Sequence, residues 1–187
     1  MPFQQSNYNG NNMNNGGEKK KTNFRVGRIY GGDGIMDVSI WKSDSATYAI
    51  LQIKQAIGKD PSTGRDSYEQ KAPNELPRMF LNSEGVRALY DFCKDTDPTT
   101  MHATLDPGRG TKITLDGSPA NVKITIEDQK KGTRSITLNA TPIGGRNIHA
   151  TWNNFLSMLQ QCVNKSVFAK LDPEEFGQNA GDEETPF

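Results

Sequence analysis

The chain has 187 residues, with 22 Lys and Arg side chains against 22 Asp and Glu side chains, and only two cysteines. This length fits one globular domain with tails. No apolar run approaches the ~18 residues of a membrane helix, and no apolar signal region follows Met1. We therefore expect neither a membrane protein nor a secretory precursor. Two cysteines are also too few for a disulfide scaffold. Low cysteine usage is typical of a reducing compartment, so we expect a cytoplasmic protein.

The net charge of zero hides an uneven distribution of charge. The segment 170–187 carries six acidic side chains against the single Lys170, and setting those six aside leaves 22 basic side chains against 16 acidic ones. A basic body attached to an acidic tail is typical of proteins that bind nucleic acid and choose partners by charge.

Composition divides the chain into three parts. Residues 1–22 are mostly Asn, Gln, Gly and Ser and end in the basic cluster Glu18–Lys21, so we predict a disordered N-terminal arm that has little to bury. Residues 23–169 carry the periodic apolar patterns and form the predicted domain. Residues 170–187 form the predicted flexible acidic tail.

The first half of the domain reads as strands followed by a helix. Period-two alternation predicts strands over 24–30, 35–42 and 46–57, with a Gly31–Gly34 turn after the first. The polar segment 59–77 predicts a long mobile loop. A short strand at 77–81 precedes a helix that Asn82 or Ser83 caps, and the helix ends at Asp97-Pro98.

The second half repeats this order. Strands are predicted over 101–105, 112–115, 120–127 and 133–141, and a helix over about 148–168. The segment Ile50–Gly58 also resembles Ser135–Gly144, since both pass from a strand into an Ile-Gly turn. We therefore predict an α+β fold made of a duplicated unit of four strands and a helix, with two antiparallel sheets and two helices.

Residues that could carry catalysis are scarce. His102 and His149 have no second ligand at metal spacing, and Cys93 and Cys162 fall on or beside the apolar stripes of helices, as buried thiols do. The segment 106–112 has the glycines of a phosphate loop but neither its spacing nor its strand-to-helix context. We predict no catalytic, cofactor or metal site, and no enzyme.

Aromatic and basic side chains alternate on the predicted strands instead. Exposed aromatics can stack on bases while cations contact phosphates, which is how proteins hold single strands without reading their sequence. The predicted single-stranded DNA site consists of these residues: Arg25, Arg28, Tyr30, Trp41, Lys42, Tyr48, Lys54, Lys112, Lys123 and Arg134.

The chain ends in three acids followed by Thr-Pro-Phe, after the polar spacer 177–181. A terminal Phe can fill an apolar pocket while its α-carboxylate meets a basic group and the acids steer the approach. This end resembles the acidic tip of bacterial single-stranded DNA-binding proteins. The predicted partner-binding residues are Asp182, Glu183, Glu184, Pro186 and Phe187.

The order of elements over about 23–168 is similar to the Whirly fold, whose half-unit is also that of the positive-cofactor single-strand-binding domain. The Lys-Gly-Lys-Ala-Ala-Leu segment of plant Whirly proteins is absent from this chain. An unusual body with a bacterial-type tail is compatible with a bacteriophage protein in the host cytoplasm. The alternative fold is an OB barrel with extra helices, the usual body behind such a tail.

These patterns favour a non-enzymatic protein that coats single-stranded DNA in replication, recombination or repair and recruits replication or repair proteins through its tail. The partners are single-stranded DNA and those proteins, with no membrane, and homo-oligomerisation stays open. The alternatives are a metal-dependent nuclease or other DNA-processing enzyme, and a virion or scaffold protein.

Overall fold

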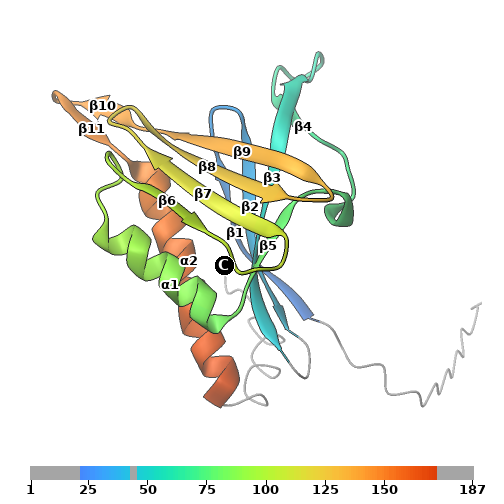
Figure 1. The fold of residues 1–187 in the computed structure, drawn as a ribbon. Coiled ribbons are helices and arrows are strands. Elements are labelled where there is room, and N and C mark those ends of the chain that lie inside the picture. Colours follow the sequence, from blue (N-terminus) through green and yellow to red (C-terminus); the bar gives the residue numbers. More distant parts are fainter. Residues whose placement is uncertain (1–21, 43–45, 172–187) are drawn as a thin grey trace, which may run out of the picture.

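The structure, a computed structural model, describes residues 22–42 and 46–171 (Figure 1). Most of the expected N-terminal arm and acidic tail therefore lies outside the described residues. The division into arm, domain and tail stays a prediction.

The first sheet is antiparallel and forms from the first half of the domain. Its strands are β1 (Thr22–Tyr30), β2 (Gly34–Lys42), β3 (Thr47–Lys59) and β5 (Arg78–Leu81), paired in that order. The far end of β3 extends beyond this sheet and pairs with β4 (Asp66–Tyr68). The short 3-10 helix η1 (Pro73–Glu75) follows β4, and α1 (Ser83–Asp95) follows β5.

The second sheet is also antiparallel, with the order β6 (His102–Leu105), β7 (Thr111–Gly117), β8 (Asn121–Asp128) and β9 (Gly132–Asn139). A separate two-stranded hairpin, β10 (Thr141–Ile143) and β11 (Arg146–Ile148), leads into α2 (Ala150–Leu171). These two short strands are not among those predicted from the sequence.

The predicted α+β class with two antiparallel sheets and two helices is confirmed. Each half of the domain runs through four strands of one main sheet and then a helix. The OB-barrel alternative is wrong, because the strands form two separate open sheets. The strands of one sheet cross those of the other steeply, and both helices lie along one side of the molecule (Figure 1).

The two segments that resemble each other in sequence, Ile50–Gly58 and Ser135–Gly144, do not occupy equivalent strands of the two sheets. Ile50–Gly58 belongs to the third strand of the first sheet, whereas Ser135–Gly144 runs from the fourth strand of the second sheet into β10. This sequence similarity therefore does not align the strands of one half with those of the other. Strands that end in exposed turns share such patterns whatever their place in a sheet.

One core joins both sheets and both helices. The inward alternation of β2 buries Met36, Val38 and Ile40, and the α1 stripe buries Val86, Leu89 and Cys93, as predicted. Asn82 caps α1, since its side-chain oxygen accepts a hydrogen bond from the Gly85 N–H at 2.8 Å. From α2 the core receives Trp152, Phe155, Leu159, Cys162 and Val163.

The turn between β1 and β2 docks on the edge of β9. The Asp33 carboxylate accepts the Thr137 N–H at 2.7 Å and the Thr137 hydroxyl at 2.9 Å, and the Gly32 N–H donates to the Thr137 carbonyl at 2.9 Å. A Cβ at Gly31 would lie 2.7 Å from that same carbonyl oxygen, so a glycine is required for the close approach. This turn therefore ties the first sheet to the second.

The segment 59–77 also ties the sheets together, where the sequence predicts a mobile loop. Glu69, which follows β4, binds the guanidinium of Arg134 with both carboxylate oxygens, at 2.7 Å from Nη2 and 2.9 Å from Nε, and accepts the Gln55 N–H at 3.0 Å. The Gln55 side chain donates to the Ser135 carbonyl at 2.5 Å. In this segment Glu69 makes the bond to the second sheet, whereas Asp60 accepts local hydrogen bonds in an exposed turn.

We predict that Arg134→Met lowers the free energy of unfolding at pH 7 by roughly 3 kcal/mol, because it strands the Glu69 carboxylate in a mostly buried position. The side chains of Arg134 and Glu69 are only 18% and 12% exposed. Urea denaturation measures this loss. Lys112→Met, which breaks the half-exposed Lys112–Glu127 pair, is the control and should cost at most about 1 kcal/mol.

The effect of Arg134→Met should depend on pH. The hydrogen bond from Arg134 lowers the pKa of Glu69. This pair therefore stabilises the fold above the unfolded-state pKa of about 4.3 and stops doing so as the pH falls through the lowered folded-state pKa. The gap in stability between the two proteins should shrink on acidification below about pH 4. A gap that stays constant would contradict this role of Glu69.

Candidate nucleic-acid interface

The outward face of the first sheet carries the aromatic and basic residues that the sequence predicts. Along β2, Asp37, Ser39 and Trp41 alternate with buried apolar residues and point away from the core. Antiparallel pairing places residues of neighbouring strands in rows across this face, and Trp41 lies opposite Tyr48.

Three aromatic rings meet at one end of this face. The rings of Trp41 and Tyr48 stack with centroids 5.9 Å apart and planes inclined by 29°, and Phe80 of β5 meets Tyr48 edge to face at 6.5 Å. All three are partly exposed. Phe80 is absent from the residues predicted from the sequence, although the alternation of β5, which buries Met79 and Leu81, already places it outward.

Two arginines accompany these rings. The guanidinium of Arg78 lies 5.1 Å from the Phe80 centroid, and that of Arg109 lies 5.4 Å from the Tyr48 centroid. Arg109 belongs to the β6–β7 loop, whose flanking Gly108 and Gly110 both have φ near +74°. We name Trp41, Tyr48, Phe80, Arg78 and Arg109 together the aromatic patch.

The arginines of β1 are held by a carboxylate. Asp37 accepts hydrogen bonds from Arg28 Nε and Nη2, both at 2.7 Å, and from Arg25 Nη2 at 2.9 Å. The bond to Asp37 raises the pKa of Arg28. The three side chains together carry one net positive charge, so this part of the face is less basic than the count of arginines suggests. Arg25 stays more than half exposed.

Part of the same face is covered. Ile35 and Gln52 occupy outward positions but are only 2% and 8% exposed, and the Gln52 amide donates to the Pro73 carbonyl at 2.7 Å. The segment that includes η1 therefore covers this region and leaves the aromatic patch open. At the end of the face near the β1–β2 turn, Tyr30 is 61% exposed and Lys54 partly exposed. Lys42 lies beside Trp41 at the end of β2.

The structure places the three remaining predicted DNA-binding residues elsewhere. Lys112 and Lys123 lie on β7 and β8 of the second sheet, and Lys112 pairs with Glu127 at 3.0 Å. Arg134 is held by Glu69. These residues do not join the aromatic patch, because the strands that carry them belong to the other sheet.

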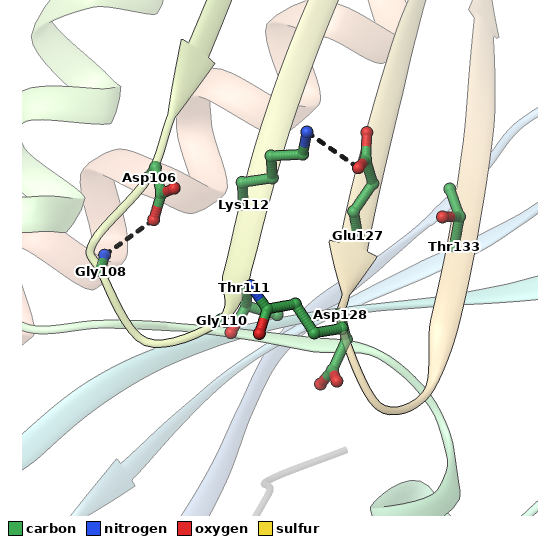
Figure 2. A pocket seen from close by; sticks show the side chains of 9 residues that line it. Asp106, Gly108, Gly110, Thr111, Lys112, Glu127, Asp128 and Thr133 are labelled. Carbon is green, nitrogen blue, oxygen red and sulfur yellow. Dashed lines mark hydrogen bonds and ion pairs between the residues drawn. The ribbon is translucent and has the colours of Figure 1, made fainter.

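Lys112 lies in a pocket of about 430 Å³ at the end of the second sheet (Figure 2). Its wall is polar, and its charged residues are the acidic Asp106, Glu127 and Asp128 and the single Lys112. No group of three or more side chains suited to hold a metal ion occurs in the described part of the chain.

The cysteines and histidines have the structural positions that the sequence predicts for them. Cys93 and Cys162 are free and buried, and burial raises the pKa of each thiol to about 12, so neither is a nucleophile at neutral pH. His149 is buried just before α2, whereas His102 contacts Asp116 on the outward face of the second sheet.

No protein family matches this chain, and no curated protein is similar to it in sequence. Among residues 22–42 and 46–171, no helix has the length and apolar character needed to cross a membrane. The predicted partner-binding residues of the tail lie outside the described residues. Among the described residues, the aromatic patch is therefore the feature that points to a function.

We predict that the double substitution Arg78→Gln and Arg109→Gln weakens binding of oligo-dT and flattens its salt dependence. Each lost phosphate contact should reduce the slope of log affinity against log salt by about 0.7. Arg87→Gln, on the exposed side of α1, is the matched control and should leave the slope unchanged. Equal slopes for both variants would remove Arg78 and Arg109 from the interface.

Proposed function

We propose that this protein binds single-stranded DNA with little sequence preference and acts in DNA replication, recombination or repair. The observation that carries the proposal is the aromatic patch: three partly exposed rings on adjacent strands, with an arginine over each of two of them.

Stacking favours single strands over duplex. Each base offers a flat face to an aromatic ring, which is worth roughly 1–3 kcal/mol per base and depends little on base identity. In a duplex these faces are already stacked on each other. The inclined rings of Trp41 and Tyr48 and the perpendicular Phe80 suit an unstacked strand that bends across the sheet.

The cations around the rings supply contacts to phosphates. Arg78 and Arg109 approach the rings from β5 and from the β6–β7 loop, and Arg25 extends the charge toward β1. A strand that lies over the patch would thus contact guanidinium groups beside its bases. Binding of this kind weakens as salt rises, because neutralised phosphates release counterions.

We predict that Trp41→Ala weakens oligo-dT binding by roughly 1–3 kcal/mol and leaves the fold intact. The chain has two tryptophans, and Trp152 is only 1% exposed. Quenching of tryptophan fluorescence by oligo-dT should therefore come from Trp41 and disappear in this variant. Titration of wild type and variant with oligo-dT and with a matched duplex measures both effects.

Trp152→Phe is the control for that titration and should keep the quenching. Tighter binding to duplex than to oligo-dT, or normal binding by a folded Trp41→Ala variant, would contradict the proposed function. Incubation of labelled single strands with Mg²⁺ tests the alternative of a nuclease, and cleavage that survives purification would favour it. Absence of binding to any oligonucleotide would favour a scaffold protein.

We also propose that the acidic tip recruits replication or repair proteins. The support is the residue order of segment 177–187, in which a polar spacer is followed by three acids and then by Thr-Pro-Phe. Acids speed encounter with a basic partner, and the terminal ring then anchors the complex in an apolar pocket.

Deletion of Asp182–Phe187 should leave single-strand affinity unchanged or raise it, most visibly at low salt, because three acidic side chains no longer compete for the basic face. Capture of replication proteins from host extract should fall sharply in the deletion and in Phe187→Ala. Thr185→Ala is the matched control. Loss of DNA binding on deletion, or equal capture with and without Phe187, would contradict this role.

A further inference from the structure

The hairpin of β10 and β11 projects from the body without a sheet to support it (Figure 1). Every residue from Thr141 to Ile148 is exposed. An isolated two-stranded hairpin is only marginally stable in water, and large apolar side chains on such an element gain free energy when a partner covers them. We name residues 141–148 the hairpin arm.

One face of the hairpin arm is suited to a contact. Ile143 lies opposite Arg146, and Thr141 lies opposite Ile148, so all four side chains share one face. Ile143 is 60% exposed and Ile148 is 41% exposed. This face is therefore apolar and carries a single positive charge.

A complementary feature occurs at the edge of the second sheet. An apolar groove of about 170 Å³ opens between α1 and β6, lined by Ala88 and Phe92 of the helix and by Ala103 and Leu105 of the strand, among others. The strand β6 ends the sheet and pairs only with β7 among the described strands. We name this feature the α1–β6 groove.

The helical wall of the α1–β6 groove has an acidic border. On a helix, residues three or four apart are neighbours. Glu84 therefore lies next to Ala88, and Asp95 lies next to Phe92; both acids are exposed. Asp91 lies three residues beyond Ala88 and is also exposed.

Two basic residues of α1 offset part of this border. Arg87 is three residues from Glu84 and four from Asp91, so it is a helical neighbour of both acids. Asp95, beside Phe92, has no basic residue three or four positions away on α1. The helix keeps one net negative charge, which favours an apolar segment with a positive charge and disfavours the acidic tail of the chain.

We propose that the hairpin arm of one copy docks in the α1–β6 groove of a second copy. Ile143 fills the groove, Arg146 faces Asp95 at its border, and the arm lies along the open edge of β6. The two surfaces are different, so the contact can close in a two-fold dimer that exchanges both arms, or repeat head-to-tail from copy to copy. It is independent of whether the protein binds DNA.

The contact should be weak in solution. Stable complexes bury about 1,200–2,000 Å², more than an eight-residue hairpin covers, so association should depend on concentration. Sedimentation velocity over a concentration series should show reversible self-association of the wild-type chain. Ile143→Asp should weaken it on the order of tenfold or more, as loss of an anchoring side chain does.

Ile57→Asp is the matched control. Ile57 is 63% exposed at the end of β3, close to the exposure of Ile143, but lies outside the hairpin arm. Its substitution should leave association unchanged. Equal effects of both variants, or a wild-type chain that stays monomeric throughout, would overturn the proposal.

Disulfide trapping tests the geometry directly. Both native cysteines are buried, so only the engineered cysteines can form disulfides between copies. A mixture of an Ala88→Cys protein with an Ile143→Cys protein should give covalent dimers, whereas Ala88→Cys mixed with Ile57→Cys should give few. Dimers from Ile143→Cys alone would indicate a symmetric arm-to-arm contact and overturn the proposal. So would association that survives Ile143→Asp but is lost with Phe187→Ala, since the tail would then occupy the groove.

Discussion

The docking of the β1–β2 turn on β9 is the constraint on which the arrangement of the sheets depends. Each sheet has one apolar face, and neither can bury it alone, so the two must be held in one relative position. Asp33 and Gly32 satisfy both backbone groups of Thr137 at the β9 edge. The same contact protects an edge strand that would otherwise offer unpaired donors and acceptors to other chains.

The ion pair between Glu69 and Arg134 reinforces this joint from a different segment. It connects the chain after β4 to β9, so the covering segment 69–77 is held in place as well as the sheets. This segment covers the region of Gln52 and leaves the aromatic patch open.

The aromatic patch and the hairpin arm serve different purposes in the proposals. The three rings of the patch lie on paired strands of the first sheet, and this pairing fixes their relative positions. The arm is a separate two-stranded hairpin and contains none of the residues of the patch. A protein with both could contact a strand and a neighbouring copy at the same time, and the strand would raise the effective concentration of the copies.

The periodicity of apolar residues in the sequence determined where most strands and both helices form. Period-two alternation in 35–42 and 46–57 and the stripe at Val86, Leu89 and Cys93 were enough to predict the strands, the first helix and the α+β class. Alternation also predicted which side of β2 Trp41 occupies. These properties are local, because the side-chain directions of a strand or helix follow from its own geometry.

Only the tertiary structure decided which residues meet. Arg109 reaches Tyr48 from the other sheet. Arg134 lies opposite the buried Ile126, on the face of the second sheet away from Lys123, and pairs with Glu69, 65 residues away. The polar composition of 59–77 predicted a loop. The sequence shows the Glu69 carboxylate but does not show that the Arg134 guanidinium binds it. Pairing between distant segments depends on how the sheets cross, and no local pattern encodes that angle.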